Sequence, residues 1–270
     1  MLKYLYDFYS SLFSRKQFYV FNKLLFSLSV RGLGLLNYKN HKISGEAFLV
    51  NNILSKIKPN VILDVGANVG NYTKLLAKNY ADVSRILSFE PHPNTFKILT
   101  QNINNEGYKN IELYNIGFGS EDKFIDIYDY KVNDGSSHAS IYKNVISDIH
   151  KCNDVVRHKI EVKTLDSFCT ENNINQIDFL KIDTEGNEYE ILIGAHDLIT
   201  EQKIKCIHFE FNEMNVISRY FFKDFYDYLV DYNMYRLLQN GLVPIKNYSP
   251  LSCELFAFQN IVAINKSVFS

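Results

Sequence analysis

An apolar segment that runs directly into a glycine-rich turn, Val61-Ile-Leu-Asp-Val-Gly-Ala-Asn-Val-Gly70, constrains the fold of this chain more than any other feature. Residues 61–65 have the pattern of a buried strand and residues 71–79 have helical spacing, so the turn joins a strand to a helix. Gly66 and Gly70 let the backbone turn sharply, and free N–H groups at the helix start favour a carboxylate or phosphate. The segment predicts a bound nucleotide-like ligand.

The acidic residues around this turn distinguish between nucleotide cofactors. A dinucleotide turn reads Gly-x-Gly-x-x-Gly, whereas Asn68 stands here where the second glycine would admit a pyrophosphate. Asp64, two residues before Gly66, suits a cofactor with an ammonium group. Glu90 lies 20 residues beyond Gly70 (90 − 70), where its carboxylate can accept hydrogen bonds from both ribose hydroxyls. These features favour S-adenosylmethionine; the alternative is that Asp64 and Asn68 only stabilise the turn.

A second motif occupies residues 177–190, Ile-Asp-Phe-Leu-Lys-Ile-Asp-Thr-Glu-Gly-Asn-Glu-Tyr-Glu. With the turn at 64–70 and the segment Phe89-Glu-Pro-His-Pro93, it closely resembles the FkbM-type methyltransferases, which transfer a methyl group to hydroxyl oxygens of sugars or natural products. The resemblance covers roughly residues 30–265. Because members of this family differ widely in acceptor, it implies the cofactor and the chemistry more firmly than a substrate.

Apolar segments alternate with helical patterns along the chain, which is typical of parallel strands joined by crossovers. The resemblance implies the class I methyltransferase (Rossmann-like) α/β fold: a doubly wound, mostly parallel, seven-stranded sheet with helices on both faces. The expected strands are 61–65, 85–89, 110–115, 178–182, 204–211, 234–239 and 255–264. The expected helices are 46–56, 71–79, 94–106, 188–196 and 219–232.

Length and regularity predict one methyltransferase domain over residues 41–270 of this 270-residue chain. Residues 123–163 interrupt the regular alternation, and their centre, 133–140, is rich in turn residues. We expect an insertion at the acceptor site. A mobile cover and an ordinary surface hairpin are equally good interpretations of it.

Residues 1–40 form a basic and aromatic extension. Apolar residues recur there at helical spacing, but Lys and Arg interrupt every run before it reaches the roughly 18 residues of a membrane span. No small-residue cleavage site follows, which argues against a secretory signal. We expect helices that cover the core or join two copies in a homo-oligomer; peripheral binding to an anionic membrane surface is the alternative.

The net charge and the cysteines indicate which partners and which cellular location we expect for the protein. The net charge is −1 and no long basic run occurs, so the sequence lacks the electrostatic pattern of a nucleic-acid-binding protein. The four cysteines are widely spaced, without a zinc-binding pattern, and none is assigned a catalytic role. A reducing cytoplasm fits them best, with the inner membrane face as the alternative place.

The family resemblance assigns the cofactor pocket residue by residue. Asp64, Gly66, Asn68 and Gly70 would shape the methionine side, and Glu90 would hold the ribose. The residues of the adenosine wall would be Pro91 and His92, with Asn115 and Gly117 at the adenine edge. All of them lie at or near the carboxyl ends of strands, which meet at one edge of an open α/β sheet.

Methyl transfer to a hydroxyl requires alignment of the reacting atoms and a group that accepts the hydroxyl proton. Asp183 is the first candidate for this base and Glu185 the second, because both lie in the most specific motif. His208 is a third, although a hydrogen-bonded core histidine is the simpler interpretation. The alternative for Asp183 is that it caps the helix that follows.

A metal-assisted reaction is a further hypothesis. Asp183, Glu210 and Asn212 follow neighbouring strands and could offer oxygen ligands to Mg²⁺. A bound ion would lower the pKa of the acceptor hydroxyl. We rank metal-independent transfer first, since isolated carboxylates are common at strand ends.

The sequence thus predicts an S-adenosylmethionine-dependent O-methyltransferase that acts on a sugar, glycan or glycosylated small molecule. The alternatives are an N-methyltransferase and a catalytically inactive cofactor-binding scaffold in carbohydrate assembly. The Asn/Asp-Pro-Pro-aromatic motif of many N-methyltransferases is absent, and Asp183-Thr-Glu-Gly186 occupies that strand end. An NAD-linked oxidoreductase is disfavoured by Asn68.

Overall fold

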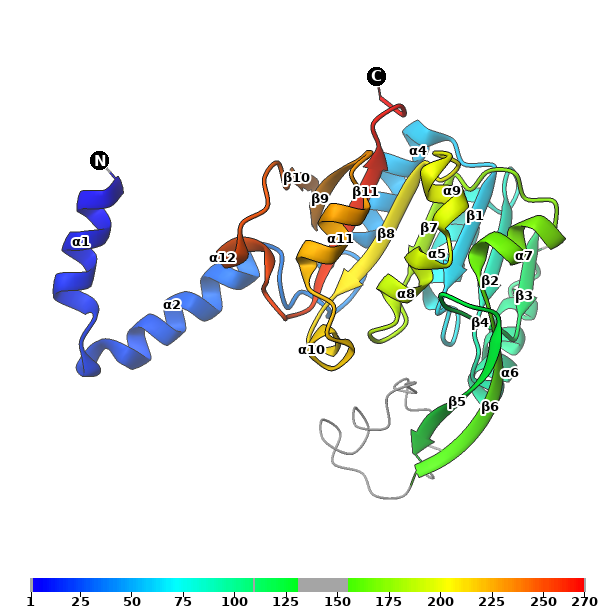
Figure 1. The fold of residues 1–270 in the computed structure, drawn as a ribbon, viewed down its shortest axis with the longest axis horizontal. Helices are drawn as coiled ribbons and strands as arrows, with labels where there is room; N and C mark the ends of the chain where they lie inside the picture. The colour runs from blue at the N-terminus through cyan, green and yellow to red at the C-terminus, as the bar shows by residue number, and fades with distance from the viewer. Residues whose placement is uncertain (1, 109, 131–154, 270) are drawn as a thin grey trace.

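A large mixed sheet carries most of the fold (Figure 1). The computed structural model describes residues 2–108, 110–130 and 155–269. In spatial order the strands of the large sheet are β10 (Gly241–Pro244), β9 (Tyr232–Leu238), β11 (Gln259–Asn265), β8 (Cys206–Phe211), β7 (Phe179–Ile182), β1 (Val61–Val65), β2 (Arg85–Phe89) and β3 (Ile111–Tyr114).

Five strands of this sheet, β3, β2, β1, β7 and β8, are parallel, and β11 pairs antiparallel with both β8 and β9. This arrangement confirms the predicted Rossmann-like class. The sequence predicted seven strands, and β10 adds an eighth at the edge through antiparallel pairing with β9. Because β10 is short and only half-buried, its sequence lacks the apolar run that marks the inner strands.

Helices cover both faces of the sheet. The helices are α1 (Leu2–Phe13), α2 (Tyr19–Gly32), α3 (Glu46–Phe48), α4 (Leu54–Ile57), α5 (Asn71–Tyr80), α6 (Pro93–Asn104), α7 (Leu165–Glu171), α8 (Glu188–Ile193), α9 (His196–Thr200), α10 (Met214–Ser218), α11 (Phe222–Tyr228) and α12 (Pro250–Cys253). A 3₁₀ turn, η1 (Lys16–Phe18), precedes α2, and a π-helical turn, η2 (Leu49–Ile53), joins α3 to α4.

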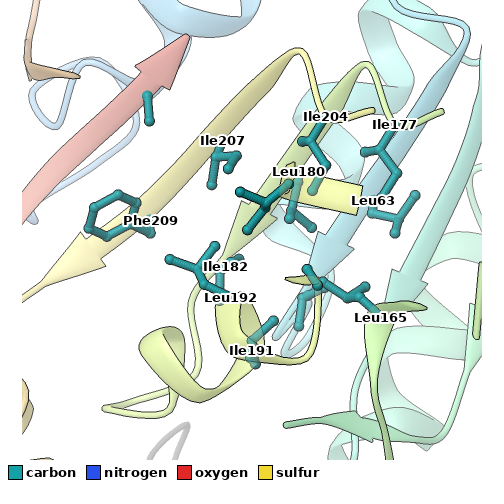
Figure 2. Close-up of a cluster of buried hydrophobic side chains, with 14 of the residues drawn as sticks. Leu63, Leu165, Ile177, Leu180, Ile182, Ile191, Leu192, Ile204, Ile207 and Phe209 are labelled. Carbon is teal, nitrogen blue, oxygen red and sulfur yellow. The ribbon is translucent and has the colours of Figure 1, made fainter. Parts of the chain in front are cut away.

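The two core layers follow from the alternation of side chains along each strand. On one face Leu63, Leu180 and Ile207 pack against α7, α8, α9 and α11, as Figure 2 shows for part of this cluster. On the other face Ile62 and Phe179 pack against η2, α4 and α5. Strands buried on both faces need continuous apolar runs, which is why the sequence marks them clearly.

A small second sheet includes residues 123–130 and 155–163, the described parts of the segment predicted to be an insertion. Its order is β4 (Gly117–Phe118), β6 (Val155–Lys163) and β5 (Lys123–Tyr130), with β5 and β6 antiparallel, and it projects from the large sheet (Figure 1). The turn-rich centre, 133–140, lies outside the described residues. The boundary between a 1–40 extension and a 41–270 domain stays a prediction.

Candidate functional site

A cleft opens where β1, β2 and β7 end. The space in and in front of the cleft, including the open solvent at its mouth, is about 970 Å³. Its lining joins the two sequence motifs to the small sheet: Val65, Gly66, Asn68, Phe89, Glu90, Pro91, His92, Thr95, Ile116, Gly117, Phe118, Ile125, Ile160, Val162, Asp183, Thr184, Glu185 and Asn187.

The glycine turn after β1 is held against the neighbouring strands. Gly66 has φ +83°, and a Cβ there would lie 1.8 Å from the carbonyl oxygen of Asp183, so only glycine fits. The N–H groups of Gly66 and Ala67 both donate to the carbonyl of Phe89, at 3.0 and 2.9 Å. Gly70, with φ +89°, begins α5. The turn is therefore fixed by backbone contacts before any ligand arrives.

Glu90 links this turn to the end of β2. One carboxylate oxygen accepts the N–H of Asn68 at 3.0 Å, and the other accepts the N–H of His92 at 2.8 Å. Burial raises the pKa of Glu90 to about 7, although these two hydrogen bonds act in the opposite direction. The carboxylate lines the cleft and retains lone pairs that a ligand's hydroxyl groups could use.

Asn68 lines the cleft and carries a polar atom that is unpartnered among the described residues. Its amide oxygen is buried and has no hydrogen-bond partner within the part of the chain that the structure describes. The backbone at Asn68 is left-handed, with φ +50°, a conformation that asparagine tolerates better than most residues. An unsatisfied buried acceptor costs free energy, so a donor supplied by a ligand would stabilise this position.

Of the four residues predicted for the adenosine wall and the adenine edge, three line the cleft and one does not. Pro91, His92 and Gly117 line the cleft, and the His92 ring lies 4.5 Å from the ring of His158 on β6. Asn115 does not line it: its side-chain amide donates to the carbonyls of Glu90 and Pro91, at 2.8 and 3.0 Å. Asn115 thus fixes the backbone of the wall rather than its surface.

Asp64 lies behind the glycine turn and is not part of the cleft lining. It is fully buried, and its carboxylate accepts a hydrogen bond from the Thr73 hydroxyl at 2.6 Å. Burial raises its pKa, and the ammonium of Lys181 acts in the opposite direction. Asp64 therefore lies beneath the turn, and its role on the cofactor's methionine side stays a prediction.

Lys181 is the principal site-forming residue that sequence reasoning missed. Its ammonium is 3% exposed and lies 2.8 Å from a carboxylate oxygen of Asp183 and 4.0 Å from Asp64. It also lies 4.7 Å from the centre of the Tyr72 ring. Burial lowers the pKa of Lys181, but the carboxylates of Asp183 and Asp64 raise it more, so the residue stays charged.

Strand register explains this cluster. Ser88, Asp64, Lys181 and His208 occupy aligned positions on β2, β1, β7 and β8. They form a polar row across the buried sheet, close to the strand ends. The only sequence signal was a lysine and an aspartate inside otherwise apolar strands.

Asp183 and Glu185 both line the cleft, as predicted. Asp183 does not cap α8, because its carboxylate binds Lys181 and the residue before α8 is Asn187. Glu188 holds the turn between Asp183 and α8. One of its carboxylate oxygens accepts the N–H groups of Thr184 and Gly186, at 2.9 and 3.2 Å. Burial raises the pKa of Glu188 to about 7.

His208 lies outside the cleft, in the core. It is fully buried; its Nε2 lies 2.9 Å from the side-chain oxygen of Asn260, and its Nδ1 lies 3.4 Å from the Tyr72 hydroxyl. Burial lowers its pKa to about 4. His208 is not among the residues that line the cleft, so its role as a base stays a prediction.

The three predicted metal ligands already have protein partners. Asp183 binds Lys181, and the side-chain oxygen of Asn212 accepts the N–H of Met214 at 2.8 Å. The amide nitrogen of Asn212, not its oxygen, faces Glu210 at 3.5 Å. Among the described residues, no group of three or more His, Cys, Asp or Glu side chains is arranged to hold a metal ion. The Mg²⁺ prediction gains no support.

The apolar wall of the cleft was also missed. Phe118 comes from β4, and Ile125, Ile160 and Val162 come from the β5–β6 hairpin. Their ordinary strand pattern gives no sign that these side chains line the cleft beside the glycine turn. Of the cysteines, Cys169, Cys206 and Cys253 are buried free thiols, and Cys152 lies outside the described residues.

Comparisons with known proteins agree with this geometry. The family described as Methyltransferase FkbM domain matches residues 64–237, well over half of the chain. The chain is 29% identical over 146 residues to Methyltransferase 1 of Beauveria bassiana (strain ARSEF 2860), covering 50% of this chain and 58% of that protein. It is 24% identical over 157 residues to Methyltransferase sdnD of Sordaria araneosa, covering 50% and 60%.

Two further similarities extend over more of the chain. The 2-O-methyltransferase NoeI of Sinorhizobium fredii (strain NBRC 101917 / NGR234) is 24% identical over 170 residues, which cover 61% of this chain and 68% of that protein. The crystal structure of Methyltransferase FkbM from Methylobacillus flagellatus KT is 15% identical with a TM-score of 0.44, over 76% of this chain and 43% of that one.

Proposed function

The chain belongs to the FkbM methyltransferase family, and from this premise we propose that it transfers a methyl group from S-adenosylmethionine to a hydroxyl of a sugar, glycan or glycosylated small molecule. One arrangement carries the proposal: the glycine turn after β1 and the carboxylate of Glu90 after β2 face the same cleft, beside the unpartnered amide oxygen of Asn68.

The cleft residues fit the parts of S-adenosylmethionine. Glu90 offers carboxylate oxygens to the two ribose hydroxyls, and Asn68 offers a buried acceptor to the ammonium group of the methionine portion. Pro91, Phe118 and Val162 provide an apolar wall for the adenine ring. When bound, the cofactor supplies a methyl group on a positively charged sulfur.

Asp183 is the residue that we propose as the general base. Its carboxylate lines the cleft, so it can accept the proton that an acceptor hydroxyl loses during transfer. Lys181, 2.8 Å away, fixes the direction of this carboxylate and keeps a compensating charge beneath it. Glu185, on the same turn and with φ +56°, is the second candidate. Holding acceptor and cofactor in line provides the rest of the rate enhancement.

The small sheet supplies what such a reaction needs around these polar groups. Ile125, Ile160 and Val162 close one side of the cleft with apolar side chains. Exclusion of water strengthens the electrostatic interactions of Asp183 and Glu90 inside the cleft. It also limits loss of the methyl group to water.

The acceptor class rests on the family and on one relative. The name of NoeI, 2-O-methyltransferase, denotes transfer to a hydroxyl oxygen. The chain spans only 58% of Methyltransferase 1 and 60% of sdnD. We therefore propose only the reacting group of the acceptor, a hydroxyl, and do not name an acceptor molecule.

Radiolabelled S-adenosylmethionine and a panel of monosaccharides, oligosaccharides and glycosides test the function. We expect label in a sugar hydroxyl as a methyl ether, with wild-type protein and not with Asp183→Asn. Label on nitrogen would favour the N-methyltransferase alternative. Cofactor binding without turnover on any hydroxyl acceptor, from a protein that is folded, would favour the scaffold alternative.

A further inference from the structure

The helices α1 and α2 project away from the body of the protein (Figure 1). The body buries most of its large apolar side chains, whereas these helices leave most of theirs in solvent. The exposed apolar residues of the two helices are Tyr4, Leu5, Tyr6, Phe8, Tyr9, Leu12, Tyr19, Val20, Phe21, Leu24, Leu25, Phe26 and Leu28. Only Val30 of α2 is buried.

The apolar residues are ordered on the helix surfaces. In α1 the polar residues Lys3, Asp7, Ser10 and Ser11 fall on one narrow stripe at helical spacing, and apolar residues fill the remaining circumference. In α2, Phe21, Leu24, Leu25 and Leu28 follow the i, i+3, i+4, i+7 pattern of a single face. Both helices thus present apolar faces that the described body does not cover.

Charge separates this segment from the rest of the chain. Residues 1–40 contain six basic residues and one acid, a net charge of +5, so the remaining residues carry −6 (−1 − 5). The side chains of Lys3, Arg15, Lys16, Lys23 and Arg31 are all exposed. A surface that is both apolar and cationic complements a bilayer that contains anionic lipid.

We propose that residues 2–32 are an interfacial anchor that binds the headgroup region of anionic phospholipid bilayers. The apolar faces enter the interface, Tyr and Phe side chains lie at headgroup depth, and the basic residues contact lipid phosphates. No helix among the described residues is long and apolar enough to cross a membrane. If two copies of the chain associated through this segment, two segments of charge +5 would lie side by side. Their repulsion disfavours a second copy as the partner of these apolar faces.

The anchor joins the body at the edge where the cleft opens. Leu35 forms a bridge with Gln259, and the N–H of Leu36 donates to the carbonyl of Phe258 at 2.8 Å. Gln259 pairs with Phe211, the last residue of β8. The junction therefore lies at the edge of the sheet where the parallel strands end.

Vesicle co-sedimentation of the full chain tests the proposal. We expect binding to vesicles of equal parts phosphatidylglycerol and phosphatidylcholine, weakening as salt is added, and none to pure phosphatidylcholine. Lys16→Gln with Lys23→Gln should weaken binding about tenfold or more. The triple change Phe21→Ser, Leu24→Ser and Leu28→Ser should abolish it.

Matched changes on the body provide the controls. Lys78→Gln with Lys246→Gln removes two exposed body cations, and Val83→Ser with Leu251→Ser removes two exposed apolar side chains. Both should bind vesicles like wild type. No binding of wild type to the anionic vesicles would overturn the proposal. Equal losses in the body variants would also overturn it. A third result would overturn it as well: wild-type protein that does not bind vesicles and forms a dimer by light scattering, with the triple change dissociating that dimer.

Discussion

The carbonyl oxygen of Asp183 lies where a side chain on Gly66 would have to be, 1.8 Å from the Cβ position. This contact joins the turn after β1 to the turn after β7, the two motifs that define the site. The glycine turn and the residue proposed as the base therefore meet in one close backbone contact.

Gly66→Ala should disrupt this contact and abolish binding of S-adenosylmethionine. We expect the free energy of unfolding to fall by at least about 3 kcal/mol, because the clash adds to the cost of a left-handed alanine. Gly107→Ala is the matched control, since Gly107 also has a positive φ, +73°, but open space around it. It should cost only about 1 kcal/mol and leave binding unchanged. Urea unfolding and calorimetry measure both, and equal effects would contradict the account.

Binding of S-adenosylmethionine should depend on pH through Glu90. Its pKa of about 7 means that the carboxylate is largely protonated in the free protein below pH 7. If ribose hydroxyls donate to the ionised carboxylate, the dissociation constant should rise by up to about tenfold for each pH unit below 7. Glu90→Gln should bind more weakly at pH 8 and flatten the profile. A wild-type profile that is flat from pH 5 to 8 would refute the ribose contact.

Asp183→Asn should separate catalysis from binding. Loss of a general base lowers kcat by roughly 10²–10⁴-fold. The asparagine keeps the shape of the turn and an acceptor for Lys181, so the cofactor dissociation constant should stay near that of wild type. Asp82→Asn, at an exposed position, is the control and should keep full activity. Steady-state kinetics with the best acceptor decide, and unchanged turnover in Asp183→Asn would exclude this base.

Lys181→Met should be strongly destabilising. It leaves the buried carboxylate of Asp64 without its cation, and the loss of one partner from a buried ion pair costs about 3–5 kcal/mol. Lys203→Met, at an exposed pair with Glu201, should leave the free energy of unfolding unchanged. Adding Asp64→Asn to Lys181→Met should recover part of the loss. Chemical denaturation measures all four proteins, and a neutral Lys181→Met would contradict the buried charge cluster.

Chelation should leave activity intact. The Lys181 ammonium already supplies positive charge to Asp183, and Asn212 uses its side-chain oxygen to hold the N–H of Met214. Turnover is compared before and after exhaustive dialysis against EDTA, with readdition of Mg²⁺. Activity that disappears on dialysis and returns with Mg²⁺ would reinstate the metal-assisted reaction.

The strands of the site could be predicted because each buried strand has its own run of apolar residues in the sequence. The predicted strands 61–65 and 85–89 match β1 and β2 residue for residue, since both are largely apolar and are followed directly by a glycine or an acid. The carboxylates at their ends could then be assigned to one cleft from the general rule for open sheets.

Features that depend on distant contacts could not be predicted. The expected helix 188–196 divides into α8 and α9, because Gly194 packs against the backbone of Gly119 and the carboxylate of Asp166 accepts the first N–H groups of α9. The pairing of Lys181 with Asp64 requires β7 to lie beside β1, across more than a hundred residues of chain. The fold of the hairpin strands over the cleft likewise left no local signal.

The central claim is that S-adenosylmethionine binds in the cleft between Asn68 and Glu90. Calorimetric titration of the cofactor into wild type, Asn68→Ala and Glu90→Ala tests it most directly, with Glu112→Ala, on β3, as the control. We predict saturable binding to wild type and to Glu112→Ala, and binding that both cleft substitutions weaken by about tenfold or more. No binding to folded wild-type protein, or equal affinity in all four proteins, would contradict the claim.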